Sequence, residues 1–196
     1  MENVYQKLDR YRVLETERLL LRPVTLADAE EMYAYASDEE NVRWTFAANQ
    51  SLEETKNIIA SIYLAHPLGR WGIELKETGQ FIGTIDMHHL KEDVGRAEFG
   101  YTLDKHFWNQ GYMTEAARVF ATLFFEKFDM NCLIARHDKE NPASGRVMQK
   151  IGMRFSHEDP YAKLDKKVPN RVITMMHYTL TKEDYFKEID SIVNEL

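Results

Sequence analysis

The stretch Trp108–Ala116, which reads WNQGYMTEA, constrains the fold of this chain more than any other. An apolar, strand-like run, Ala97–Leu103, precedes it, and a long helical pattern, Tyr112–Phe128, overlaps its end and continues beyond it. A strand, a tight polar turn with a glycine and a helix start expose successive backbone N–H groups at the positive end of a helix dipole. The stretch therefore predicts a binding site for phosphate groups, although an ordinary strand-to-helix turn can have the same pattern.

A second set of landmarks lies downstream of this turn. Asn141-Pro142-Ala143-Ser144 opens a short helical pattern that ends near Gly152. The order is then strand, anion-binding turn, long helix, strand, Asn-x-x-Ser, short helix, glycine, strand. This order resembles the GNAT superfamily of N-acetyltransferases, and within it the RimJ/RimL-like ribosomal-protein N-acetyltransferases.

Two further segments are similar to the RimJ/RimL-like branch, namely Leu14–Pro23 and Ala97–Tyr101, and the resemblance runs from about Leu14 to Tyr185. It implies a mixed α/β (α+β) fold with a central, mostly antiparallel sheet of about seven strands, splayed in the middle, and helices on both faces. The chain is expected to form one domain over residues 1–196, with a core of about 14–185 and a C-terminal helix of about 182–195.

The same resemblance implies a coenzyme A site. The family's loop reads Arg/Gln-x-x-Gly-x-Gly/Ala, and here the equivalent stretch ends at Met113, a larger residue whose side chain must point away from the pyrophosphate. The pantetheine arm would lie along the preceding strand, against the backbone of Tyr101 and Leu103, as an added strand does. The pyrophosphate of acetyl-CoA would contact the turn and helix start, at Asn109, Gln110, Gly111, Tyr112, Met113 and Thr114.

Asn141 and Ser144 would also act on coenzyme A by this resemblance. Asn141 would bond the pantetheine region, and Ser144 would lie near the thioester sulfur and donate a proton to the departing thiolate. Many family members carry a tyrosine acid seven residues after the asparagine, but here that position is Met148. Because the usual tyrosine acid is absent, Ser144 is favoured as the acid, with water as an alternative. Asn141 and Ser144 are also common helix caps, which is the competing interpretation.

Glu98 is a carboxylate within an otherwise apolar strand. The resemblance gives it the role of general base, directly or through an ordered water. A solvent-facing charge or a surface ion pair is the alternative. The adjacent His88 and His89 point to opposite faces of a strand, so one of them could line the acceptor cleft. No group of His, Cys and carboxylate residues has the spacing of metal ligands, so we expect no metal.

Charge and composition limit the classes of molecule that this protein is expected to bind. The net charge is −7, whereas a nucleic-acid-binding protein needs a basic surface to replace phosphate counterions. No apolar run is long enough to cross a membrane, and the polar start Met1–Lys7 lacks the apolar core of a signal peptide. A single cysteine, Cys132, allows no intrachain disulfide. We expect a cytoplasmic monomer or homodimer whose partner is an amine acceptor, not a nucleic acid or a membrane.

The implied reaction is transfer of an acetyl group from acetyl-CoA to a primary amine. Only a neutral amine can attack the thioester, and near neutral pH a lysine amine incurs a deprotonation penalty of about 4 kcal/mol. An α-amine incurs well under about 1 kcal/mol, so with one candidate base the α-amine of a protein or peptide is the favoured acceptor. The alternatives are a small-molecule amine (a polyamine, amino sugar or amino acid) as acceptor, and a non-catalytic acyl-CoA-binding sensor.

Overall fold

A computed structural model describes residues 2–165 and 167–194 of the chain, with the backbone alone for residues 190–194. The expected domain ends at residues 1 and 196, and the expected last helical residue, 195, lie outside the described residues. The chain forms two compact units. Unit 1 comprises Met1–Met87 and Gly100–Val119, and unit 2 comprises His88–Phe99 and Phe120–Leu196. The expectation of one domain stays a prediction.

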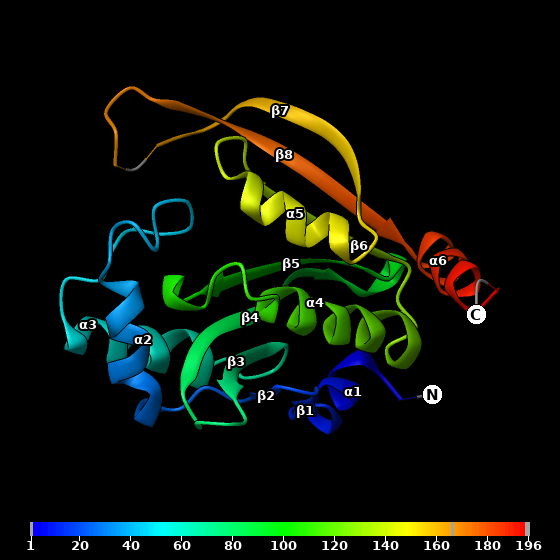
Figure 1. The fold of residues 1–196 in the computed structure, drawn as a ribbon, viewed down its shortest axis with the longest axis horizontal. Coiled ribbons are helices and arrows are strands. Elements are labelled where there is room, and N and C mark those ends of the chain that lie inside the picture. The colour runs from blue at the N-terminus through cyan, green and yellow to red at the C-terminus, as the bar shows by residue number, and fades with distance from the viewer. Residues whose placement is uncertain (1, 166, 195–196) are drawn as a thin grey trace. The chain divides into compact units, whose positions relative to one another are not determined.

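Unit 1 contains one half of the sheet (Figure 1). Its first four strands pair antiparallel in sequence order, and the fourth is followed by β5 in the sheet. The fourth and fifth strands run from one unit into the other. The bounds are β1 Leu14–Glu15, β2 Leu19–Arg22, β3 Arg70–Leu75, β4 Phe81–Lys91 and β5 Arg96–Leu103.

Unit 2 contains the other half. Strand β6 (Cys132–Asp138) pairs parallel with the start of β5 and antiparallel with β8 (Val172–Thr181), and β7 (Arg154–Leu164) pairs antiparallel with β8. Among the described residues the strand order is β1-β2-β3-β4-β5-β6-β8-β7. The mixed α/β fold with a mostly antiparallel sheet is confirmed. The described sheet has eight strands, close to the expected number of about seven, and the additional strand, β1, is only two residues long.

Five of the six α-helices in the described part of the chain follow the sequence patterns. Helices α3 and α4 each continue into a wider π-helical turn, Ile59–Leu64 and Leu123–Lys127 respectively. Helix α1 was not expected, although Asn3 and Gln6 cap its start reciprocally through backbone and side chain. The bounds are α1 Val4–Arg10, α2 Ala29–Ala36, α3 Leu52–Ile58, α4 Tyr112–Thr122, α5 Pro142–Lys150 and α6 Lys182–Asn194.

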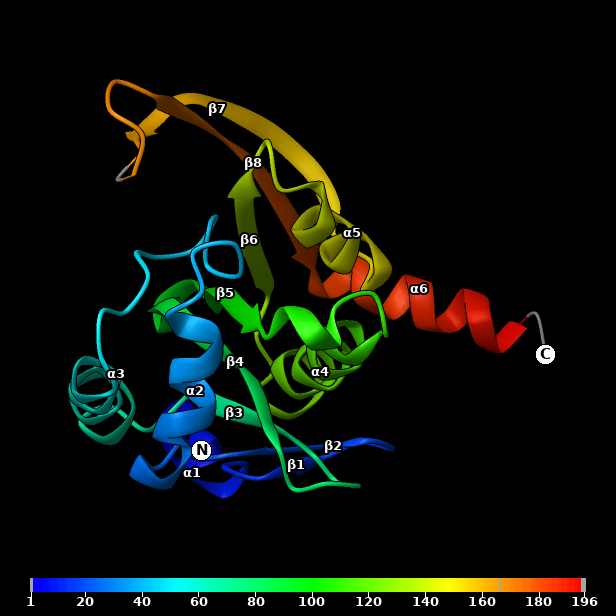
Figure 2. The same ribbon diagram turned by 60° about the vertical axis from the view of Figure 1, so that its left-hand side comes forward.

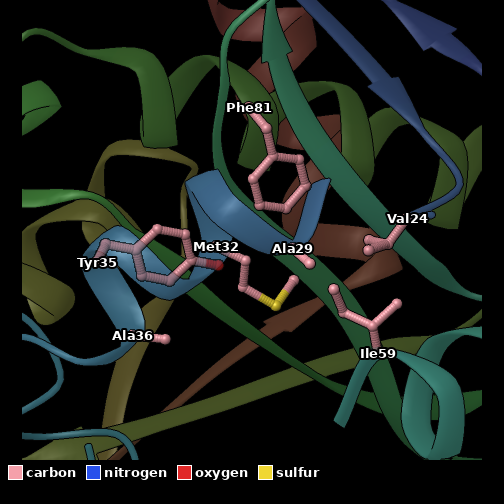
Figure 3. Packing of buried hydrophobic residues seen from close by; sticks show 7 residues of the cluster. All are labelled: Val24, Ala29, Met32, Tyr35, Ala36, Ile59 and Phe81. Atoms are coloured by element: carbon pink, nitrogen blue, oxygen red, sulfur yellow. The ribbon is translucent and has the colours of Figure 1, made fainter. Parts of the chain in front are cut away.

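The core of unit 1 includes a cluster where α2 and α3 meet the sheet. Side chains from these elements point toward one another (Figure 3), and the rings of Tyr35 and Phe81 stack with centroids 6.4 Å apart. Burying apolar side chains of this size stabilises a fold by about 1.5–3 kcal/mol each. The cluster consists of Val24, Ala29, Met32, Tyr35, Ala36, Ile59 and Phe81.

The core of unit 2 contains a chain of aromatic rings. Phe120 packs against Phe99 of β5 and Phe124, and Phe125 stacks on Tyr185 of α6 with centroids 4.8 Å apart. Helix α5 packs against β6, β7 and β8, beside which it lies in both views (Figure 1 and Figure 2). These contacts position the start of α5 next to the end of β6.

Candidate functional site

The predicted anion-binding turn lies in unit 1, directly before α4. Asn109 and Gly111 both have positive φ, 59° and 84°, and Tyr112 begins the helix. Such a left-handed conformation costs an L-residue such as Asn109 roughly 1–2 kcal/mol, whereas glycine adopts it freely. Left-handed residues that alternate with other conformations turn successive N–H groups toward a common side, which forms an anion-binding concavity. Residues 109–111 are exposed, so the turn is open to a ligand.

The strand before this turn is tied to it by hydrogen bonds. The Trp108 indole Nε1–H donates to the Leu103 carbonyl over 2.9 Å, and the Gln110 side-chain amide donates to the His106 carbonyl over 2.8 Å. The Leu103 carbonyl also accepts a bond from Asn41 Nδ2 over 3.2 Å. A carbonyl oxygen has two lone pairs, so the acceptor capacity of Leu103 is fully used.

The first residues of α4 divide into exposed backbone and buried side chains. Met113 is 6% exposed and Thr114 8%, so both side chains face the core. The unusual Met113 of the loop motif is therefore a packing residue. Only the backbone of these two residues is available to a ligand. Tyr112 is half-buried and its ring meets Phe107 edge-on.

A contact that sequence reasoning missed supports the same turn. Glu115, in the first turn of α4, accepts bonds from Thr16 Oγ1 (2.5 Å) and from Arg18 N (3.0 Å) and Nε (2.7 Å). Burial opposes ionisation of Glu115, but the bonds from Thr16 and Arg18 outweigh it and lower the pKa of the carboxyl group below its usual value. The only sequence signal was that Thr16 and Arg18 belong to the segment Leu14–Pro23.

Glu98 lies in the part of β5 that belongs to unit 2. Its side chain is 14% exposed, and both carboxylate oxygens are engaged. Arg136 Nε of β6 donates to Oε1 over 2.9 Å, and His89 Nδ1 of β4 lies 3.1 Å from Oε2. Glu98 is thus neither a free surface charge nor a fully buried one. Glu98 forms an ion pair with Arg136, which agrees with the alternative interpretation. Its carboxylate also lies next to the exposed imidazole of His89.

His89 reaches Glu98 because the backbone of β4 bends there. Its φ is 47°, a left-handed value that interrupts the alternation of side chains along a strand. The His89 side chain is 68% exposed, so it connects the carboxylate of Glu98 to solvent. The simple expectation that His88 and His89 point to opposite faces of a regular strand takes no account of this bend.

Polar residues continue from Arg136 across the neighbouring strands of unit 2. Arg136 of β6 is paired in register with His177 of β8, and His177 with His157 of β7. The two imidazoles stack with centroids 4.4 Å apart. Burial, followed by the charges of His157 and Arg136, lowers the pKa of His177, and Asp159 and Glu98 oppose this in part. The neutral form of His177 is therefore favoured in the folded protein.

Asn141 and Ser144 lie at the start of α5, also in unit 2. Asn141 occupies the N-cap position, but its side chain makes no capping hydrogen bond there. The capping interpretation of Asn141 therefore lacks its usual bond. Ser144 is half-buried in the first turn, and its backbone N–H donates to the Asn141 carbonyl over 3.2 Å. Met148 is 1% exposed and packs in the core.

The following residue, Gly145, lets α5 approach the sheet closely. A Cβ atom at this position would lie 2.6 Å from His137 Nε2 and 3.2 Å from the Tyr178 hydroxyl. Nearly any other residue would push the helix outward, and Ser144 with it. The sequence reasoning did not identify this requirement.

The candidate residues therefore fall into two sets. Unit 1 holds Tyr101, Leu103 and the turn 109–114, and unit 2 holds Glu98, Asn141 and Ser144. Within the described residues, no group of three or more His, Cys, Asp or Glu side chains is arranged to hold a metal ion. None of the helices in the described part of the chain has both the length and the apolar character that a membrane span requires.

Known proteins share this arrangement of elements. The family model described as an acetyltransferase (GNAT) domain matches residues 18–154. YoaA of Bacillus subtilis (strain 168), an N-acetyltransferase by name, is 33% identical over 148 residues, which cover 74% of this chain and 84% of YoaA. YdaF of the same organism, provisionally named a ribosomal N-acetyltransferase, is 29% identical over 58% of this chain and 62% of its own. The crystal structure of an acetyltransferase (GNAT family) from Bacillus anthracis has a TM-score of 0.76 at 25% identity, and covers 87% of this chain and 99% of that one.

Proposed function

Because the chain belongs to the GNAT family of N-acetyltransferases, and is therefore an acyltransferase, we propose that it acetylates the α-amine of a protein or peptide. The observation that carries this proposal is the carboxylate of Glu98. Its side chain is 14% exposed and lies between Arg136 and the exposed His89. A carboxylate in such a position can accept a proton from an incoming amine and pass it toward water.

Acetyl-CoA is the donor that the family uses, and the turn in unit 1 fits its pyrophosphate. The left-handed conformations of Asn109 and Gly111 are those that turn successive N–H groups toward a bound anion, and the start of α4 adds the positive end of a helix dipole. A Cβ atom on Gly111 would have a single described neighbour within 4 Å, Arg18 Nη2 at 3.3 Å, so this part of the turn is open. We assign the pyrophosphate contacts to the backbone N–H groups of residues 109–114.

The pantetheine arm would pair with the backbone of β5. The Leu103 carbonyl already accepts two hydrogen bonds, so on this residue only the backbone N–H could contact the arm, and Tyr101 is the second proposed contact. The Asn141 side chain makes no capping bond at the start of α5, so its amide can bond the arm.

When bound, acetyl-CoA supplies an acetyl thioester that a neutral amine can attack. Glu98 takes the proton that the amine loses as its nitrogen bonds to the carbonyl carbon. The C–S bond breaks and its electron pair stays on sulfur. Ser144 donates its hydroxyl proton to that sulfur as the Ser144 oxygen takes a proton from water. His89, 3.1 Å from Glu98, offers the carboxylate a route to solvent for the proton it has gained.

Two considerations favour an α-amine as acceptor. A single carboxylate base next to water is enough for an amine that is partly neutral at physiological pH, whereas a lysine amine must first lose a proton at a cost of about 4 kcal/mol. The provisional name of YdaF also points to protein acetylation. These arguments support the RimJ/RimL-like assignment within the family.

The test is a thiol-release assay with acetyl-CoA and a panel of amines. Peptides that begin with Ser or Thr are compared with the same peptides blocked at the N-terminus but carrying one lysine, and with spermidine, glucosamine and free amino acids. We expect turnover with the free N-terminal peptides at neutral pH. Turnover confined to the small amines, or to the blocked lysine peptides, would overturn the α-amine assignment.

A further inference from the structure

We infer that Arg18 is a positioning residue that holds the pyrophosphate-binding turn in its binding conformation. This inference rests on the proposed function, because it assumes that the turn binds the pyrophosphate of coenzyme A. Arg18 lies just before β2, far from the turn in sequence. In unit 1 its guanidinium contacts the turn and the first residues of α4.

Arg18 fixes the direction of one backbone N–H group. Its Nη1 donates to the Gln110 carbonyl over 3.0 Å. In a trans peptide the carbonyl of one residue and the N–H of the next point in opposite directions. With the Gln110 carbonyl directed toward Arg18, the N–H of Gly111 must point away from it. The bond to Arg18 thereby orients a donor that we assign to the pyrophosphate.

The guanidinium also contacts Tyr112. It lies over the Tyr112 ring, 4.3 Å from the ring centroid, and a Cβ added to Gly111 would lie 3.3 Å from its Nη2. Gln110 and Tyr112, the residues on either side of Gly111, are thus supported by one side chain. The guanidinium suits this task because it is planar and carries five donors in fixed directions.

Glu115 holds Arg18 in place. Its carboxylate accepts hydrogen bonds from Arg18 Nε over 2.7 Å and from Thr16 Oγ1, and its Oε2 lies 2.7 Å from Arg18 Nη2 in an ion pair. The pairing also compensates the negative charge of Glu115. Without Arg18, a carboxylate in the first turn of α4 would repel an anion bound there. Arg18 neutralises Glu115 and supports the turn at the same time.

The test compares Arg18→Gln with Arg12→Gln. Both changes remove one guanidinium from an ion pair, and the two side chains are similarly exposed, 41% and 44%. Calorimetric titration with CoA should show an affinity about tenfold or more weaker for Arg18→Gln, from the loss of charge-assisted bonds, and an unchanged affinity for Arg12→Gln. Arg18→Lys keeps the charge without the fork of donors, and we expect it to weaken CoA binding as well.

Amide NMR separates a positioning role from general stabilisation. In Arg18→Gln, the Gly111 amide resonance should shift and lose its response to CoA, while that of Gly79, in the β3–β4 turn, stays where it is. An unmoved Gly111 resonance, or CoA affinity like that of the wild type in Arg18→Gln or Arg18→Lys, would overturn the inference. Wild-type protein that does not bind CoA would instead overturn the proposed function.

Discussion

Arg136 Nε donates a hydrogen bond to Glu98 Oε1 over 2.9 Å, and this bond holds the carboxylate of β5 from the adjacent strand β6. The second carboxylate oxygen is left to His89, which is mostly exposed. One side of the carboxylate is thus fixed by a permanent cation and the other faces an ionisable, solvent-accessible partner. The first prediction follows from this asymmetry.

Glu98→Gln keeps the size of the side chain but removes the proposed base. We expect kcat/KM to fall by roughly 10²–10⁴, the usual contribution of general-base catalysis, with CoA affinity unchanged. The deficit should shrink as the pH rises through the pKa of the acceptor, near about pH 8 for an α-amine and above about pH 9 for a lysine. Glu158→Gln is the control, because Glu158 is an exposed partner of Lys139 in the same unit. A rate like that of the wild type for Glu98→Gln at neutral pH would rule out the base assignment.

Gly111→Asp introduces a carboxylate where we propose that the pyrophosphate binds. CoA affinity should fall by at least about tenfold, since like charges repel and the left-handed backbone disfavours any side chain. Gly79→Asp is the matched control, because Gly79 has a similar φ of 72° and no described atom near a would-be Cβ. Both variants should lose a comparable roughly 1–2 kcal/mol of stability from the backbone conformation. Calorimetry that finds equal CoA affinities for the two variants would contradict the assignment of the turn.

Ser144→Ala tests the proposed acid. If Ser144 protonates the departing sulfur, kcat should fall more than KM rises, because the proton transfer occurs only in the transition state. Ser156→Ala, which removes an exposed hydroxyl from β7 in the same unit, should leave both constants unchanged. Steady-state kinetics with an accepted amine would measure the difference. Turnover intact in Ser144→Ala, with only a lower melting temperature, would make Ser144 a structural residue.

His177 makes the stability of unit 2 depend on pH. Its pKa is lowered in the folded protein, so between that pKa and the unfolded value of about 6.5 the unfolded chain binds more protons. The contribution of His177 to the free energy of unfolding is fully present above about pH 6.5, and it is lost as the pH falls through the pKa of His177 in the folded protein. Urea unfolding at pH 7 and pH 5 should show a smaller loss of stability for His177→Gln than for the wild type. Equal losses would show that His177 does not titrate as described.

Local features of the chain were predictable. The glycine-containing turn before α4 and α4 itself follow from one glycine and an apolar pattern of helical period, and the β3–β4 hairpin follows from two apolar runs around Gly79. These signals are confined to neighbouring residues, so they can be read without knowing the fold. The capping residues Asn3 and Gln6 of helix α1 are a local signal of the same kind.

Contacts between distant segments were not predictable. Glu115 and Arg18 are 97 positions apart, and Asn41 reaches the Leu103 carbonyl across 62. Nothing in either local sequence specifies the partner. The direction of the His89 side chain was not predictable for a different reason. The rule that side chains alternate assumes a regular strand, and the backbone at His89 is left-handed. The candidate site could be predicted as a set of residues, but not as a network of hydrogen bonds.

The bond from the Trp108 indole to the Leu103 carbonyl closes a ring of chain that spans five positions. Surface loops usually tolerate insertions and deletions, but a closed ring of fixed span does not, because one added residue would separate donor from acceptor. Relatives that keep a tryptophan at this position should therefore align here without gaps. Length variation, where it occurs, should fall in other loops, and this segment would serve as a fixed reference for placing the turn in more distant sequences.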